Sequence, residues 1–254
     1  MPNSLRAFFA AVLVSMIGIA SLPVHAAELV VIAVTGSTDI APGARLDDGK
    51  AIELSDGVSL TMLSQSGAII KLKGPHSGPP VASSSATAGS DTNWSNTLTG
   101  VNRLVGKSPK TSNVMGASRQ VEGAEFNDPS DGIWLMAVES SGHRCVRAAG
   151  AEMWRFNTDT ALKIDLRSDN ARLRGLEWAE GQPRLALPNQ FIEDGTLIVM
   201  KFGKNPRRFN LHVLPEHIEV EGWGRILRWM LEQQCDRQAQ ILVDALHEDV
   251  ISAE

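Results

Sequence analysis

The chain has 254 residues, of which 43% are hydrophobic, so it is long enough for one large domain or two modest ones with buried cores. Its 24 Lys and Arg residues are outnumbered by 29 Asp and Glu residues, which gives a formal net charge of -5. Nucleic-acid binding would need clustered positive charge, so the composition argues against a DNA or RNA partner.

The N-terminus has the pattern of a secretory signal peptide. Arg6 precedes an apolar run over residues 7–22, and the small residues that follow favour cleavage between Ala26 and Ala27. We therefore expect residues 1–26 to be removed and the mature protein to be periplasmic, with no membrane span after cleavage. The alternative is an uncleaved anchor helix, but the run is shorter than the ~20 apolar residues that a membrane span needs.

The segment 46–78 has the pattern of a small antiparallel β unit. Three strand patterns, at residues 51–54, 58–63 and 68–73, are separated by Ser-Asp-Gly and Ser-Gly turns, which supply the positive-φ positions of tight hairpins. Apolar residues alternate in the second and third patterns, which places one set of side chains on a buried face and the other toward solvent. A further buried strand is expected at residues 28–34.

The layout of glycine, turn and apolar positions in this segment resembles the FecR-type β domain of bacterial envelope proteins. The matching residues are Gly49, Ile52, Leu54, Asp56, Gly57, Leu60, Leu63, Gly67, Ile70, Leu72, Gly74 and Pro75. Residues 111–119 resemble a divergent form of a second segment of that family, so the resemblance covers residues 28–119. It implies a periplasmic protein with a FecR-like β domain whose core spans residues 27–80.

Residues 81–131 are expected to connect two β-rich parts. Residues 81–92 are small and polar, as in a flexible linker or a long loop. Apolar residues recur at helical spacing over residues 94–104, which predicts a short helix that completes the first domain. A polar, irregular stretch follows, and we place the domain boundary at its end, near residue 131.

Residues 132–221 contain many short strand patterns separated by turn signals, which is typical of a β-sandwich. The expected strands are residues 133–138, 144–147, 153–156, 161–166, 171–178, 185–187, 196–202 and 208–214. The order of Trp, Pro and Asp-Gly within residues 176–199 is similar to that of immunoglobulin-like domains, which implies the same architecture.

Residues 222–254 have the apolar stripe of an amphipathic helix, so we expect a C-terminal helical tail. Polar residues at 233–236 interrupt the stripe, which predicts a break with Asp236 capping a second helix. A helix with one apolar stripe needs a docking surface. The expected fold is therefore mainly β: a FecR-like domain, then a sandwich-like domain with a helical tail.

The two cysteines, Cys145 and Cys235, are expected to form a disulfide. An even number of cysteines in an exported chain favours pairing, because the compartment is oxidising. The bond would attach the tail to the sandwich, and a loop of this length contributes about 4 to 5 kcal/mol in the chain-entropy model. The alternative is two separate buried thiols.

Few patterns in the chain indicate nucleotide or catalytic chemistry. Gly100 and Gly106, followed by Lys107 and Ser108, resemble a phosphate-binding loop, but five residues separate the glycines where the motif has four. Three pairs of carboxylates are adjacent in sequence and turn-like, which is typical of solvated surfaces: Asp47 and Asp48, Glu193 and Asp194, and Glu248 and Asp249. No Gly-x-Ser-x-Gly nucleophile motif occurs in the sequence.

Histidines are the remaining candidates for a metal site. His212 and His217 are close in sequence, and His143 could join them from a distance, but this is not the ligand spacing of a zinc site. His76 lies at a turn without a positioned partner for general-base work. We therefore expect surface histidines, with no metal or cofactor.

The tryptophans are expected to be core residues, with an aromatic face for sugars or peptides as the alternative. The six are Trp94, Trp134, Trp154, Trp178, Trp223 and Trp229. The sequence as a whole favours a non-catalytic envelope protein that binds a protein or glycan partner, as a scaffold or as a periplasmic signalling input. The alternative function is a secreted metal-dependent hydrolase that uses His143, His212 or His217.

Overall fold

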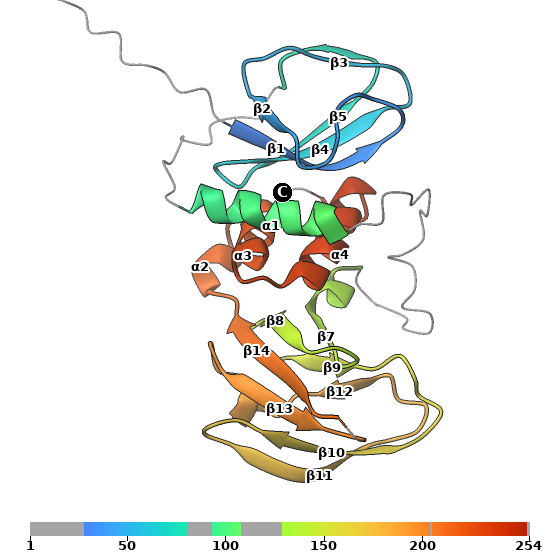
Figure 1. Cartoon of the computed structure of the whole chain (residues 1–254), viewed down its shortest axis with the longest axis vertical. Helices are drawn as coiled ribbons and strands as arrows, with labels where there is room; N and C mark the ends of the chain where they lie inside the picture. The colour runs from blue at the N-terminus through green and yellow to red at the C-terminus, as the bar shows by residue number, and fades with distance from the viewer. Residues whose placement is uncertain (1–27, 81–92, 108–128, 204, 253–254) are drawn as a thin grey trace, which may run out of the picture.

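The computed structural model describes residues 28–80, 93–107, 129–203 and 205–252. The predicted signal peptide with Ala26 and Ala27, the predicted linker 81–92 and the segment 111–119 lie outside the described residues. The described chain is mainly β and is stacked in layers along its long axis (Figure 1). An N-terminal sheet lies at one end, two C-terminal sheets at the other, and helices between them.

The N-terminal sheet has four antiparallel strands in the order β2-β1-β4-β5. Their bounds are Arg45–Asp47 for β2, Glu28–Thr35 for β1, Ser59–Ser64 for β4 and Ile69–Lys73 for β5. The hairpin β4–β5 and strand β1 confirm the sequence prediction. One face of the sheet packs into a core that includes Leu29, Val31, Leu60 and Met62.

The first predicted strand of this region forms but does not join the hairpin. Strand β3 (Ile52–Leu54) pairs with β6 (His76–Gly78) in a separate two-stranded sheet. The chain can return past the β3–β4 turn because residue 74 is glycine: a Cβ there would lie 1.9 Å from the carbonyl oxygen of Ser55. Local turn signals do not encode this close passage.

The second face of the N-terminal sheet is also buried, contrary to the alternation predicted from sequence. Alternation with Leu60 and Met62 predicts that Thr61 and Leu63 face solvent, yet both are buried. Leu63 belongs to the same apolar cluster as residues of the C-terminal helices, and strands β1 and β4 contact α4 (Asp236–His247). The helices cover the second face of the sheet, so neither face is exposed to solvent. The alternation within the strand could not indicate this, because the covering helices lie far along the chain.

The helical layer brings together two distant segments of the sequence. Helix α1 (Trp94–Lys107), predicted over 94–104, contacts α3 (Trp223–Glu232) and α4. A short helix, α2 (Glu216–Glu219), precedes α3. The apolar stripes of α1, α3 and α4 meet in one cluster, so the predicted tail is the central layer of the molecule.

The predicted break in the tail is confirmed, but the predicted cap is wrong. The N-cap of α4 is Cys235, and Asp236 is the first residue of the helix. The carboxylate of Asp236 instead accepts hydrogen bonds from Arg103 of α1, with 3.1 Å between Nη2 and Oδ1. Asp236 therefore joins two helices rather than capping one.

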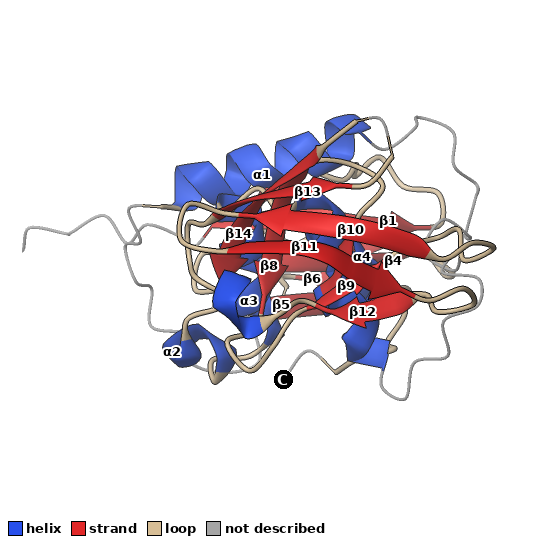
Figure 2. Cartoon of the chain, turned by 90° about the horizontal axis from the view of Figure 1, so that it is seen from below, coloured by secondary structure: helices blue, strands red, loops and turns tan. Residues whose placement is uncertain are grey.

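The C-terminal part contains a five-stranded sheet and a three-stranded sheet, which Figure 2 views from below. The larger sheet is ordered β11 (Arg172–Trp178), β10 (Leu162–Arg167), β13 (Leu197–Lys201), β14 (Arg207–Val213) and β8 (Gly142–Val146). The smaller is ordered β12 (Arg184–Ala186), β9 (Glu152–Trp154) and β7 (Leu135–Ala137). Their inward side chains share one core.

Two 3-10 turns and two parallel strand pairs complete this part. Residues 133 and 134 belong to a 3-10 turn, η1 (Pro129–Trp134), so strand β7 is shorter than predicted. A second 3-10 turn, η2 (Asn189–Phe191), precedes β13. Two strand pairs, β8 with β14 and β7 with β9, are parallel.

The prediction of core tryptophans is confirmed for five of the six. Trp94, Trp134, Trp154, Trp178 and Trp229 are buried. Trp223 is half-buried and packs against the helical cluster.

Candidate functional site

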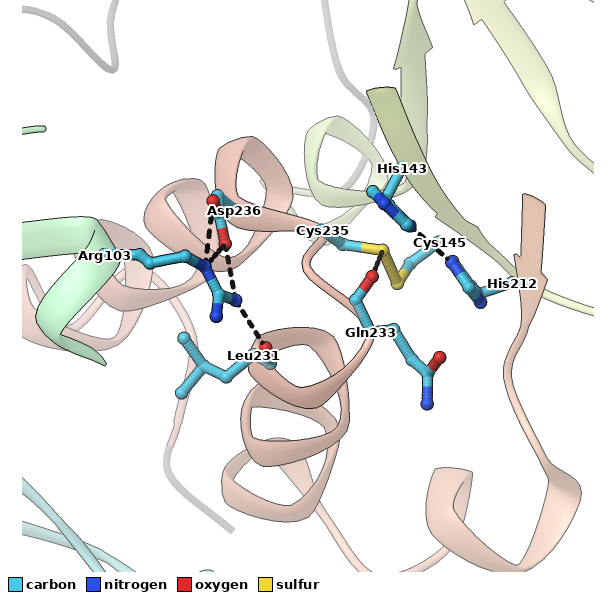
Figure 3. A network of polar contacts seen from close by, with 8 residues as sticks. All are labelled: Arg103, His143, Cys145, His212, Leu231, Gln233, Cys235 and Asp236. Carbon is cyan, nitrogen blue, oxygen red and sulfur yellow. Dashed lines mark hydrogen bonds and ion pairs between the residues drawn. A yellow bond between two sulfur atoms is a disulfide. The ribbon is translucent and has the colours of Figure 1, made fainter. Parts of the chain in front are cut away.

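The predicted disulfide joins the five-stranded sheet to the helical layer. Cys145 of β8 bonds to Cys235 at the N-cap of α4, with a Cα–Cα distance of 5.9 Å (Figure 3). Both residues are buried. The sequence prediction of this bond and of its role as a link between tail and sheet is confirmed.

Next to the disulfide, the side chain of Gln238 pairs with the backbone of β8. Its Oε1 accepts from the Cys145 N–H at 2.8 Å, and its Nε2 donates to the carbonyls of Cys145 at 2.6 Å and Ile133 at 3.0 Å. Sequence analysis missed this residue, although one signal was available. Gln238 is followed by Ala239 and lies one turn before Leu242 on the buried side of the helix, and a polar residue there needs buried partners.

The structure brings together two of the three histidines proposed as metal ligands. The Nδ1 of His143 lies 2.8 Å from the Nε2 of His212, and the rings stack with centroids 5.1 Å apart (Figure 3). They meet because β8 and β14 are neighbouring parallel strands. His217 lies on α2 and His76 on β6, so neither belongs to the pair.

The environment of the pair favours a neutral imidazole at His212. Burial lowers the pKa of His212, the nearby His143 lowers it further, and Asp194 acts in the opposite direction. The two facing nitrogens share one proton, because one must donate where the other accepts. Within the described ranges, no group of three or more His, Cys, Asp and Glu residues is placed to hold a metal ion.

A groove runs along the α2–α3 connection, where the helical layer meets the end of β8. One part is a hollow of about 350 Å³ whose wall combines charged and apolar side chains. It is lined by Arg147, Glu219, Val220, Glu221, Gly222, Trp223 and Ile226. A second hollow of about 210 Å³ adjoins it, because Glu221 lines both.

A left-handed glycine, an ion pair and a cation–π contact lie in the wall of the groove. Gly222 caps α3 with a φ of 93°, a left-handed conformation that favours glycine, and the chain turns sharply there. Arg147 stacks over Trp134 at 4.8 Å from the ring centroid, and its Nε lies 3.2 Å from Oε1 of Glu219. Val220 is left 80% exposed at the rim.

The groove has the composition of a protein-binding surface rather than of a reaction centre. It joins exposed and half-buried apolar groups to arginines and glutamates, which is the mixture found at non-obligate interfaces. Sequence analysis considered His217, Trp223 and Trp229 separately but did not predict that they lie along one groove. The signal available was the Val-Glu-Gly sequence at 220–222, where an apolar residue precedes a turn.

No protein-family model matches the chain, and neither does any curated protein or solved structure. None of the described helices combines the length and the apolar character needed to cross a membrane. What the protein does must therefore be inferred from its own geometry.

Proposed function

We propose that this protein is an exported, non-catalytic envelope protein that binds a protein or glycan partner, as a scaffold or as a periplasmic signalling input. The observation that carries the proposal is the α2–α3 groove, which places the exposed Val220 beside charged and aromatic side chains. A surface of this composition suits a partner with both apolar and charged groups.

The disulfide supports the exported location. Disulfides persist in oxidising compartments such as the periplasm and are rare in the cytosol, and this one links two layers of the fold. The pattern of residues 1–26 agrees with the same destination, since it matches a cleavable signal peptide.

For the N-terminal sheet we propose a FecR-type β domain, and for the C-terminal sheets an immunoglobulin-like sandwich. The FecR-like residues Leu60, Ile70 and Leu72 lie on the hairpin β4–β5 and face its core. The two C-terminal sheets share one core, and β10, β13 and β14 are neighbours, as strands C, F and G are in that fold. A solved structure with a different connectivity would remove the sandwich proposal.

Affinity purification tests the groove as the partner site. Val220→Glu adds a charge to the rim of the groove, and Val250→Glu adds the same charge to an exposed valine beyond α4. We expect partners recovered from native envelope extracts with the wild type and with Val250→Glu to be lost with Val220→Glu. Recovery of the same partners with all three proteins would contradict the proposal.

A second candidate function, a secreted metal-dependent hydrolase, is favoured by the contact between His143 and His212. Metal analysis of protein purified without chelator distinguishes the two functions. Stoichiometric zinc that disappears in a His143→Ala, His212→Ala variant would support the hydrolase. Metal-free protein that still binds its partner would support the binding function.

A further inference from the structure

The outer face of the five-stranded sheet carries a line of arginines. The register places Arg172 of β11 opposite Arg167 of β10, Arg167 opposite Val199 of β13, and Val199 opposite Arg208 of β14. Directly paired residues of antiparallel strands project from the same face. The four residues therefore form one line across four strands, which we name the arginine row.

The arginine row faces away from the core. Its residues alternate along each strand with Leu166, Met200 and Phe209, which are fully buried between the two C-terminal sheets. The three arginines are exposed, and Val199 between them is half-buried. Figure 2 looks onto this end of the molecule, where no helix covers β10 or β11.

The three guanidinium groups are available for a ligand. Within the described residues, no carboxylate lies within ion-pair distance of any of them. The acidic residues of this face, Glu177 and Asp165, make other contacts further along the strands. Glu177 pairs with Lys163 at 3.5 Å, and Asp165 accepts a hydrogen bond from the Gly175 N–H. A chain with an acidic net charge thus concentrates unpaired positive charge on one line.

We propose that the arginine row binds an acidic polysaccharide, one that carries a carboxylate on each successive sugar. Each arginine can bind a carboxylate through two parallel hydrogen bonds. Neighbouring strands are about 4.8 Å apart, which is comparable with the length of a sugar ring, so the row spans about 14 Å. Arg172 and Arg167 lie one strand apart, and Arg208 lies two strands beyond Arg167. Val199 offers an aliphatic contact to the sugar ring that lies between the rings bound by Arg167 and Arg208.

Other polyanions fit the row less well. The outward positions of the four strands contain no Phe or Trp, on which the bases of a nucleic acid would stack. An extended acidic peptide spaces same-side carboxylates by about 6.6 Å, which exceeds the strand spacing.

Binding of polygalacturonate to the purified mature chain tests the inference, with dextran as the neutral control polymer. We expect saturable binding that weakens with added salt, because exposed charges are screened. Arg167→Gln with Arg208→Gln should weaken binding by about tenfold or more, since two bidentate contacts are lost. The matched control, Arg45→Gln with Lys50→Gln, removes the same charge far from the row and should stay within about twofold.

A lysine pair at the same positions tests the geometry rather than the charge. Arg167→Lys with Arg208→Lys keeps the charge but loses the planar fork, so we expect intermediate binding. Equal losses in the row and control variants would overturn the inference, and so would tighter binding of polyglutamate, single-stranded DNA or anionic vesicles than of polygalacturonate. The inference rests on the proposed exported location for access to such a glycan. The polygalacturonate binding experiment needs no partner protein. It can therefore fail while the Val220→Glu experiment succeeds, or succeed while that experiment fails.

Discussion

At the residue scale, Gln238 replaces a missing strand partner for β8. Its side-chain amide accepts and donates hydrogen bonds as a backbone peptide group would. These bonds satisfy the N–H and the C=O of Cys145 and the C=O of Ile133. These groups are buried, and a buried backbone group without a partner destabilises a fold. Gln238 therefore supports the strand that carries both the disulfide and His143.

Replacing Gln238 with leucine should lower the free energy of unfolding by about 2 to 4 kcal/mol, because three buried backbone groups lose their partner. Gln240 lies on the same helix, half-buried, and bonds only to Asp244 in the described structure. Gln240→Leu is the matched control and should change the stability by less than about 1 kcal/mol. Urea denaturation of both variants measures the difference, and equal effects would contradict this role of Gln238.

A single histidine joins the N-terminal sheet to the helical layer. The Nε2 of His247 lies 2.7 Å from the hydroxyl of Thr35, and its Nδ1 lies 2.7 Å from that of Thr61. Burial lowers the pKa of His247, as do Lys71 and Lys73, whereas Glu248 and Asp249 act in the opposite direction. The contact between the N-terminal sheet and the helical layer therefore contains a neutral imidazole.

The lowered pKa of His247 predicts that the folded protein loses stability as the pH falls. The unfolded chain, with an ordinary histidine pKa of about 6.5, binds more protons below that pH than the folded chain does. His212 acts in the same direction. Hydrogen bonds from Lys71 and Lys73 hold the pKa of Asp249 at about 2. This carboxylate therefore stays ionised in the pH range in which histidines titrate, and it does not change the stability there.

Thermal denaturation at about pH 7.5 and pH 5 measures this effect. The melting temperature of the wild type should fall at the lower pH, and that of His247→Gln should fall less, because glutamine keeps a hydrogen bond to threonine without titrating. His217→Gln, an exposed histidine on α2, is the control and should behave as the wild type. An equal fall in all three proteins would exclude His247 as the titrating group.

At the element scale, the packing of α1 on α3 depends on one glycine. A Cβ on Gly100 would lie 2.7 Å from the Cβ of Leu231, too close for the helices to keep their distance. Gly106 lies in the same helix, and a Cβ there would meet nothing within 4 Å. Comparing substitutions at Gly100 and Gly106 therefore separates the effect of close helix packing from the general effect of glycine on helix stability.

The two alanine substitutions should have opposite signs. Gly106→Ala should stabilise the protein by about 0.5 to 1 kcal/mol, since alanine favours the helix. Gly100→Ala gains the same propensity but should destabilise by about 1 to 3 kcal/mol net, because the helices must move apart. Denaturation curves of both variants check this, and a stabilised Gly100→Ala would show that the contact is tolerant.

Several elements could be predicted from the sequence because their signals are local. Alternation and Gly turns predict the hairpin β4–β5, and helical spacing predicts α1 and the break between α3 and α4. The pairing of β3 with β6, the burial of Thr61 and the meeting of His143 with His212 could not be predicted. Each depends on a partner far along the chain, and a single sequence records no such pairing. The groove was missed for the same reason, since α2, α3 and β8 form it together.

At the scale of the whole molecule, the helical layer lies between the sheets and its C-terminal helices touch both ends (Figure 1). Helix α4 contacts β1 and β4 on one side and β8 on the other, where the disulfide fixes it. Partner binding at the α2–α3 groove, at the edge of this layer, would therefore be positioned relative to both β parts.

Removing the disulfide should weaken this connection. The bond closes a loop with a sequence separation of 90 residues. Cys145→Ser with Cys235→Ser should lower the free energy of unfolding by about 4 kcal/mol, because the unfolded chain gains freedom and the variant buries two hydroxyls. Calorimetry of the variant, and of the wild type with and without reductant, measures it. An unchanged melting temperature would contradict a structural role for the bond.

Mass spectrometry of the protein recovered from its native envelope, alkylated without reduction, tests the export on which the proposed function depends. The expected result is an N-terminus at Ala27 and a peptide pair linked through Cys145 and Cys235. A chain that retains Met1 and carries both thiols alkylated would contradict the account.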